Sequence, residues 1–203
     1  MTKSNGFIIL LIAAITGCMG NNLTNFTRPD NSQIVIGETS RDQIIEIMQK
    51  KPDAVGKKMY NNTVVDVFEY SYIGDESQAD IKDDNYLPAK TQYYYIEKDI
   101  VVGTEFHSSF AIDHTRYDED AIGQVIKGKT TKDEVIQLFG NPGILLGKAL
   151  VPDSASGAIG YHYRNMQLVS PTDLRTYATK VVFEYDGDGV IQNIEYESSR
   201  NNS

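Results

Sequence analysis

The chain has 203 residues, with 28 acidic against 19 basic side chains, a formal charge of -9 and 40% hydrophobic residues. This length allows one large domain or two small ones. The acidic balance excludes a protein that binds the nucleic-acid backbone, which needs a basic face. The apolar content, with 13 Tyr and 7 Phe, excludes wholesale disorder. The single cysteine excludes an internal disulfide and a cysteine-rich zinc site.

The cysteine lies at the end of a predicted export signal. An apolar run over residues 7–15 follows a short polar start that contains Lys3. This order is typical of the charged and apolar regions of a secretory signal. The run is too short to span a bilayer stably, which takes about 20 residues.

The four residues that end this run, Ile15-Thr-Gly-Cys18, resemble a bacterial lipobox. The resemblance implies that residues 1–17 are a signal peptide and that Cys18 carries acyl chains, palmitate among them, that anchor the protein in the membrane. Met19 follows the cysteine instead of Asp, which by resemblance to Gram-negative lipoproteins implies the outer membrane, facing the periplasm. The alternative is an ordinary secretory signal followed by a free thiol. Residues 18–32, rich in Asn and Thr, predict a flexible lipid-anchored tether.

The rest of the chain contains an internal repeat of about ninety residues. Residues 32–48 align without gaps with residues 123–139, and the segments 93–106 and 183–196 align near the ends of the two repeats. Similarity at both ends of each repeat indicates a tandem duplication. The predicted organisation is unit 1 over residues 33–112, a linker over 113–120 and unit 2 over 121–199.

Each unit begins with the same predicted helix-start motif. In both units a threonine stands two residues after a glycine and three residues before an aspartate, which resembles a capping box. Apolar residues then recur at helical spacing, until Pro52 in unit 1 and a Gly-Asn-Pro-Gly run from Gly140 in unit 2. The motif residues are Gly37, Thr39 and Asp42 in unit 1, and Gly128, Thr130 and Asp133 in unit 2.

Strands are predicted after each helix. Alternating residues indicate a strand over 64–72 and a matching one in unit 2, and each unit ends in a hairpin, turned by residues 97–99 or 186–189. Polar stretches over 74–90 and 165–178 read as insertions between strands. We therefore predict an α+β fold of two tandem units, each with short helices followed by an antiparallel sheet of three to four strands.

Helices on one face of such a sheet would leave the other face free to bind a partner. Tyr94 points away from the face that Tyr93 and Tyr95 share, and His162 lies in a strand, opposite in phase to its tyrosine neighbours. Tyr94 and His162 are therefore candidates for a binding surface, because tyrosine combines a large apolar ring with a polar tip. The alternative is a sheet core rich in tyrosine.

At the paired Gly-x-Thr motifs the chain resembles the SmpA/OmlA (BamE-like) lipoprotein family. Unit 2 is the closer match, with Gly128-Lys-Thr130, Gly140-Asn-Pro142 and the closing hairpin over 182–190 in the family's order. The resemblance implies BamE-like units and a non-enzymatic envelope scaffold similar to the outer-membrane protein assembly factor, with the barrel-assembly machinery as a candidate partner. That factor has one unit, however, and the tandem arrangement resembles beta-lactamase inhibitory protein. This second resemblance implies the alternative, an envelope-anchored inhibitor or binding protein.

Three further patterns do not predict a catalytic or cofactor site. Residues 123–130 satisfy the P-loop spacing, but charged residues precede them where a P-loop follows a buried strand, so we expect no nucleotide. Residues 186–189 resemble the start of a calcium loop, but the further oxygen ligands are missing. No two of His107, His114 and His162 stand three or four residues apart, so no helical metal pair exists. We expect no catalytic residue, no metal and no cofactor.

Overall fold

The computed structural model describes residues 24–60, 63–81, 86–170 and 173–201. The predicted signal peptide, Cys18 and the first part of the tether lie outside these residues. The strands are β1 Ala54–Tyr60, β2 Thr63–Ile73, β3 Tyr86–Leu87, β4 Ala89–Glu97, β5 Ile100–Ser108, β6 Ile144–Leu146, β7 Gly157–Ser170, β8 Asp173–Tyr185 and β9 Ile191–Asn201. The helices are α1 Arg41–Met48 and α2 Lys132–Phe139, with short 3-10 helices at Asn31–Gln33, Glu76–Gln78, Ala111–Asp113, Glu119–Gln124 and Lys148–Leu150.

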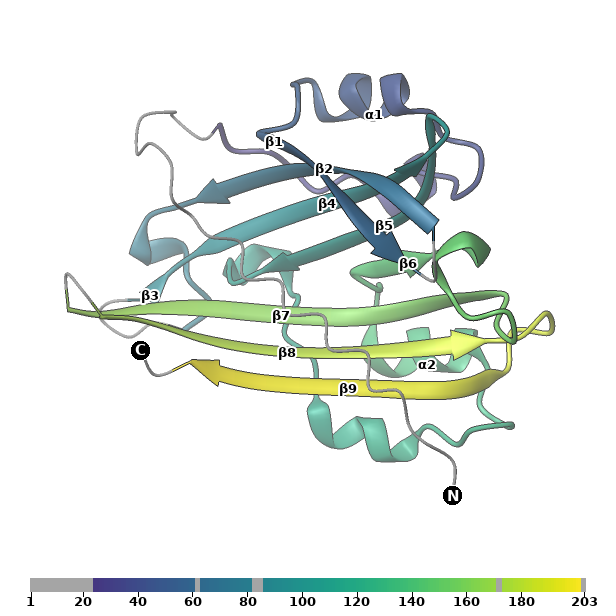
Figure 1. Ribbon diagram of the computed structural model, residues 1–203. Coiled ribbons are helices and arrows are strands. Elements are labelled where there is room, and N and C mark those ends of the chain that lie inside the picture. The colour runs from purple at the N-terminus through teal and green to yellow at the C-terminus, as the bar shows by residue number, and fades with distance from the viewer. Residues whose placement is uncertain (1–23, 61–62, 82–85, 171–172, 202–203) are drawn as a thin grey trace.

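A single antiparallel sheet contains all nine of these strands (Figure 1). Hydrogen-bonded neighbours follow the order β1-β2-β4-β5-β6-β7-β8-β9, and β3 pairs with β7. The short strand β6 pairs with β5 on one side and with β7 on the other. The backbone hydrogen bonding therefore continues from the first half of the chain into the second.

The predicted α+β fold of two tandem BamE-like units is wrong. Strand makes up 49% of the chain and helix 20%, so one large sheet dominates and the helices are few and short. Residues 165–178 are not an insertion between strands, because the described residues among them belong to β7 and β8. The end of this hairpin is largely exposed on both faces, so no apolar alternation marks it as strand.

Both α helices pack on the same face of the sheet, which we call the helix face. The cross-strand partners Thr104, Leu145 and Ile159 connect β5, β6 and β7 on this face. Under α1 the buried cluster includes Ile44, Met48, Phe68, Tyr70, Tyr94 and Phe106, and under α2 it includes Val135, Ile159, Tyr161, Val181, Phe183 and Ile191. The opposite face has its own cluster of Tyr60, Val65, Tyr95 and Leu150.

Capping boxes start both helices, but one residue after the predicted hydroxyl. The Ser40 side chain accepts from the backbone N–H of Gln43, and the Gln43 side chain accepts from the N–H of Ser40. Thr131 and Glu134 form the same pair at the start of α2. Asp42 and its counterpart instead lie in the first turn, where a carboxylate interacts favourably with the helix dipole.

The predicted motif residues form a tight turn before each helix. The hydroxyl of Thr39 accepts a hydrogen bond from the backbone N–H four residues earlier at 2.8 Å, and that of Thr130 does the same at 2.9 Å. Gly37 and Gly128 have positive φ angles of 88° and 74°, and their N–H groups donate to backbone carbonyls of β5 and β9. The two halves of the chain thus attach their helix-start turns to the sheet by matching hydrogen bonds.

The predicted tether is shorter than residues 18–32. Phe26 is buried in the cluster under α1, and the Arg28 guanidinium lies 5.0 Å from the centroid of the Phe106 ring. Arg28 also donates a hydrogen bond to the backbone carbonyl of Pro142, which follows α2. The chain from Phe26 onward therefore belongs to the packed protein, because it contacts both halves.

Candidate functional site

The sheet opens where β6 ends. β6 pairs with β5 as far as Glu105 and with β7 as far as Gly160. Between these residues and the place where β3 pairs with Met166 and Gln167 of β7, no described strand lies next to β7 on this edge. We call this gap the seam. Strand alternation places Glu105 and His107 of β5, and His162 of β7, on the face opposite the helices. The rings of His107 and His162 meet across the seam, with 4.5 Å between their centroids.

Glu105 is the centre of a buried polar cluster at the seam. Its carboxylate accepts a hydrogen bond from the Tyr95 hydroxyl at 2.9 Å and contacts His162 Nδ1 at 2.7 Å. The Lys180 ammonium lies 3.0 Å from each carboxylate oxygen. Only 7% of the Glu105 side chain is exposed, so these partners replace water around a buried charge. We call Tyr95, Glu105, His107, His162 and Lys180 the seam cluster.

The surroundings fix the charge states of two cluster members. Burial alone would raise the pKa of Glu105, but the Lys180 ammonium and His162 hold this pKa well below its usual range. The pKa of His107 is well below its usual range, first because burial disfavours the imidazolium and then because His162 lies beside it. At neutral pH, Glu105 is therefore ionised and His107 is neutral.

One nitrogen of this neutral histidine lacks a partner. His107 is 5% exposed, and within the described chain its Nδ1 atom is buried without a hydrogen bond. Its ring contacts are aromatic, with His162 and with Tyr93, whose centroid is 6.1 Å away. This nitrogen is therefore open to a hydrogen bond from a water molecule or to coordination of a cation.

The end of β1 covers the cluster on the face opposite the helices. The Tyr60 ring packs on Tyr95 with 5.2 Å between centroids, and Lys58 Nζ donates to the Tyr60 hydroxyl at 2.7 Å. Burial lowers the pKa of Lys58, and the charge of Glu105 opposes this shift. The carboxylate of Glu105 is therefore influenced by two lysines, one on β1 and one on β8.

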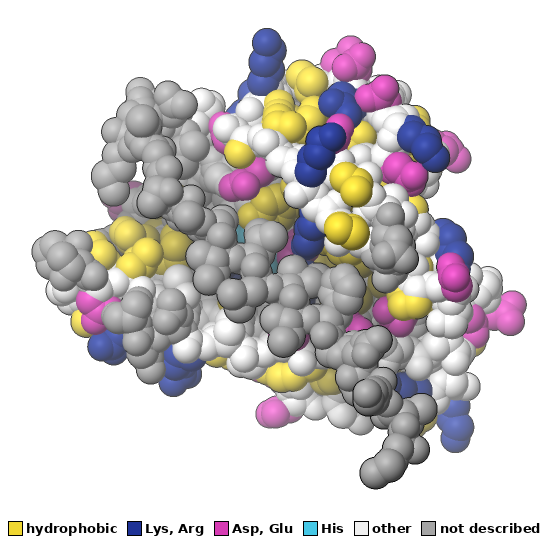
Figure 2. All heavy atoms as spheres, viewed as in Figure 1, with side chains coloured by type: hydrophobic (Ala, Val, Ile, Leu, Met, Phe, Trp, Pro, Cys, Tyr) yellow, Lys and Arg dark blue, Asp and Glu magenta, His cyan; other side chains and the backbone are white. Residues whose placement is uncertain are grey.

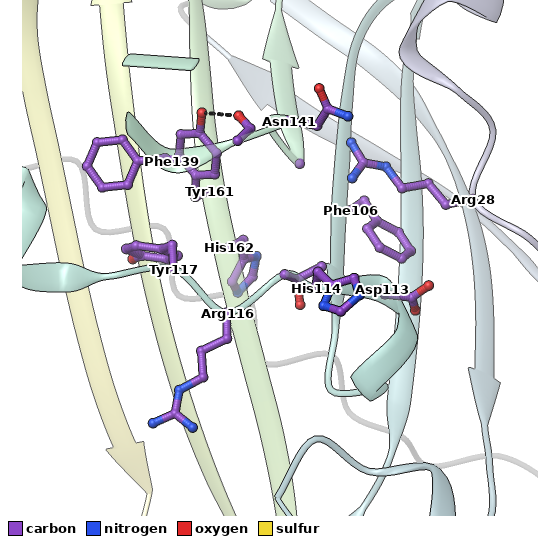
Figure 3. A pocket seen from close by; sticks show the side chains of 13 residues that line it. Arg28, Phe106, Asp113, His114, Arg116, Tyr117, Phe139, Asn141, Tyr161 and His162 are labelled. Carbon is purple, nitrogen blue, oxygen red and sulfur yellow. Dashed lines mark hydrogen bonds between the residues drawn. The ribbon is translucent and has the colours of Figure 1, made fainter. Parts of the chain in front are cut away.

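A pocket of about 390 Å³ reaches the cluster from the helix face (Figure 3). Arg28, Phe106, Asn141 and Tyr161 line it, and His162 belongs to both the pocket lining and the seam cluster. Figure 3 shows the Arg28 guanidinium close to the Phe106 ring, on the opposite side of the pocket from Tyr161. The pocket and the seam cluster therefore meet at His162.

The structure places Tyr94 and His162, the two residues predicted to lie on a binding surface, in different environments. Tyr94 is fully buried under α1, where its hydroxyl donates to Met48 Sδ at 3.3 Å. The prediction that Tyr94 lies on a binding surface is wrong, because its sheet face is the one that the helix covers. His162 has a side chain that is 15% exposed and belongs to the seam cluster. Gly37, Thr39, Gly128 and Thr130 form the helix-start turns, and Cys18 lies outside the described residues.

Sequence reasoning missed Glu105 and His107. The histidines were assessed by a spacing that applies to helices, whereas residues two apart on a strand share a face. The predicted hairpin segment ended at residue 106, whereas β5 continues to Ser108, so Glu105 and His107 share a face that the prediction did not give them. The approach of His162 had no local signal, since it depends on a sheet register set through the three residues of β6.

No protein-family model matches the chain, and neither a curated protein nor a solved structure matches it. The resemblance to the SmpA/OmlA family therefore rests on the motif residues alone. Function has to be argued from the site and the surfaces.

The side chains of the seam cluster match a common set of metal ligands. In the part of the chain that the structure describes, neither His107 nor His162 hydrogen-bonds a Ser, Thr or Cys side chain. A nucleophile next to its base is the signature of covalent catalysis. An ionised carboxylate beside two imidazoles is instead a common set of metal ligands.

Proposed function

We propose that the protein is a non-enzymatic, lipid-anchored protein of the bacterial cell envelope that binds another envelope protein along its edge strand β1. The proposal that the partner binds along β1 rests on one observation. Among the described strands, β1 pairs with β2 alone, and its outer edge is bordered by exposed apolar side chains. Unpaired backbone groups on an edge strand are a template to which an extended segment of a partner adds as a further strand.

The exposed apolar side chains are Val55, Met59 and Val64, which we call the edge patch. Their exposed fractions are 62%, 62% and 57%. Met59 and Val64 are direct cross-strand partners, and Val55 lies four residues before Met59 on the same side of β1. Hydrophobic side chains are visible on the surface around β1 (Figure 2). Clustered apolar residues on a protein surface support a role in protein binding.

Two further features support the rest of the proposal. Among the described residues, neither cluster histidine hydrogen-bonds a Ser, Thr or Cys side chain, which supports a non-enzymatic role. The lipobox ending in Cys18 supports the lipid anchor. Within the described ranges, no helix is long and apolar enough to cross a membrane.

Affinity capture from solubilised envelopes tests the partner. We expect the full chain to recover components of the barrel-assembly machinery, and Met59→Glu to lose them. Ile112→Glu is the matched control, because Ile112 is 80% exposed and lies outside the edge patch. Capture of a single enzyme instead would favour the alternative function as an inhibitor. Equal recovery by the wild type and Met59→Glu would contradict binding along β1.

Membrane fractionation tests the anchor separately. We expect the wild type in the membrane fraction and Cys18→Ala in the soluble fraction, because the acyl chains supply the membrane affinity. Retention of Cys18→Ala in the membrane fraction would mean that the lipid is not the anchor.

A further inference from the structure

We propose that Glu105, His107 and His162 form a binding site for one divalent first-row transition metal ion, with zinc as the preferred probe. Each residue offers one ligand atom, and these atoms lie within 4.8 Å of one another. Two imidazoles and one carboxylate form a ligand set typical of zinc sites with three protein ligands. This inference goes beyond the proposed binding of an envelope protein and does not depend on it.

The strongest support for a metal site is the unpartnered nitrogen of His107. A buried imidazole nitrogen without a hydrogen bond is costly, and in the described chain Nδ1 of His107 is such an atom. Coordination through Nδ1 would satisfy this atom.

The geometry requires only a small movement. Zinc binds nitrogen and oxygen at about 2.0–2.2 Å, so neighbouring ligand atoms around a tetrahedral ion lie roughly 3.3 Å apart. Glu105 and His162 already approach to 2.7 Å, and the longest separation within the trio is 4.8 Å or less. The longest separation therefore has to shorten by at most about 1.5 Å, which side-chain rotation can supply. The three ligands come from β5 and β7, strands that are held in the sheet and therefore position them firmly.

A water molecule from the pocket can occupy the fourth coordination position of the metal ion. Among the described residues, no other His, Cys, Asp or Glu joins the trio. His162 also lines the pocket of about 390 Å³, which exceeds the roughly 30 Å³ that a water molecule occupies in the liquid. We therefore expect a water molecule from this pocket to complete the coordination.

Lys180 competes with the metal. Its ammonium binds both oxygens of Glu105 at 3.0 Å and so occupies the electrostatic position that a cation would take. The Lys180 side chain is 28% exposed, so it can turn toward solvent when the metal binds. The competition predicts that a neutral residue at position 180 strengthens metal binding.

Metal titration of the full chain, purified in detergent without a histidine tag and stripped with a chelator, tests the site. We expect one Zn²⁺ per chain with a Kd below ~10 μM, and Co²⁺ to give the visible absorption of a site with nitrogen ligands. Mg²⁺ is not expected to compete, because it prefers oxygen ligands and octahedral geometry. Imidazole NMR signals of His107 and His162, but not of His114, should shift on zinc addition.

Four variants decide the outcome. We expect His107→Ala and Glu105→Gln each to weaken zinc binding at least ~10-fold, the exposed-histidine control His114→Ala to leave it unchanged, and Lys180→Met to tighten it roughly tenfold. Circular dichroism establishes that each variant is folded, and the imidazole shifts of the wild type test the site even where a variant does not fold. Absence of stoichiometric zinc binding, or zinc shifts confined to His114, would overturn the proposal. An equal loss of binding in His114→Ala and His107→Ala would overturn it as well.

Discussion

Lys180 on β8 and Glu105 on β5 form an ion pair across the seam, with the ammonium 3.0 Å from each carboxylate oxygen. The carboxylate is 7% exposed and the lysine side chain 28%. The pair joins strands from the two halves of the chain at the place where β6 no longer does. It is therefore a side-chain contact between the two halves of the chain in addition to the backbone pairing of β6.

We expect Lys180→Met to lower the free energy of unfolding by about 2–3 kcal/mol, because removing one partner leaves a buried charge uncompensated. Tyr95 and His162 still donate to Glu105, which keeps the loss below the ~3–5 kcal/mol typical of a broken buried pair. The double variant Glu105→Gln/Lys180→Met should be more stable than Lys180→Met alone. Urea unfolding at neutral pH in metal-free buffer measures both differences. If Lys180→Met lowers the free energy of unfolding by less than about 0.5 kcal/mol, the pair contributes no more than an exposed ion pair, and the prediction is wrong.

The helix-start glycines allow a test of backbone conformation alone. Gly37 and Gly128 have φ angles of 88° and 74°, and a side-chain carbon at either position would meet no atom within 4 Å. Gly37→Ala and Gly128→Ala should each cost about 1–2 kcal/mol, the penalty of a left-handed residue other than glycine.

Gly123→Ala is the matched control for these two variants. It also has open space around it but no positive φ angle. We expect thermal unfolding to show it unchanged or slightly more stable, since alanine restricts the unfolded chain. Equal losses at all three positions would mean that the φ angle is not the cause.

Local structure was predictable from the sequence, and the sheet as a whole was not. The hairpin turns at Lys98 and Asp186 and the alternation of Phe68 and Tyr70 against Val65 are local patterns, and the structure contains them. The repeated turns at Gly37 and Gly128 are local as well. The joining of the two halves into one sheet depends instead on β6, whose three residues are too short to give a periodic signal.

The candidate site was likewise predictable only in its local features. Strand phase indicated that His162 points away from its tyrosine neighbours, and the structure places it so. Phase alone could not tell which sheet face the helices cover, and Tyr94 was assigned to the wrong one. The contact of His162 with His107 and Glu105 is non-local, because 57 residues separate Glu105 from His162. No spacing rule within one strand or helix reports such a contact.

The Tyr161 hydroxyl ties β7 to the end of α2. It donates to the backbone carbonyl of Gly140 at 2.7 Å, and the ring is 4% exposed. We expect Tyr161→Phe to lose about 1 kcal/mol of stability, because the carbonyl loses a buried donor while the packing of the ring is kept. Tyr196→Phe is the control, since Tyr196 also donates through its hydroxyl but is 45% exposed. Chemical denaturation should show a clearly larger loss at position 161, and equal losses would contradict the role of the Gly140 contact.

Lys90 is a buried cation surrounded by aromatic rings. It is 6% exposed, and its ammonium lies 5.0 Å from the Phe26 centroid, 5.8 Å from that of Tyr72 and 5.1 Å from that of Phe110. Burial lowers its pKa, and the charge of Asp113 opposes the shift. The attraction of the rings offsets part of the desolvation cost of the charge, about 0.5–2 kcal/mol per cation–π contact.

Lys90→Met removes the charge and keeps an unbranched side chain that suits an aromatic environment. At pH 7 we expect the variant to be as stable as the wild type or more stable by about 1 kcal/mol. The folded pKa of Lys90 is lowered, so the cost of burying its charge is complete below that pKa. The cost fades as the pH rises from there to the ordinary lysine range, because the unfolded chain then holds the proton more firmly than the folded one.

The advantage of Lys90→Met should therefore shrink between pH 7 and about pH 10. Tyrosine ionisation affects both proteins alike and cancels in the difference between their free energies of unfolding. Lys57→Met serves as the control, since the Lys57 side chain is 74% exposed, and its difference from the wild type should stay near zero at both pH values. A difference for Lys90→Met that is constant with pH would mean that burial of the Lys90 charge does not limit stability, and that the three rings and Asp113 offset its cost in full.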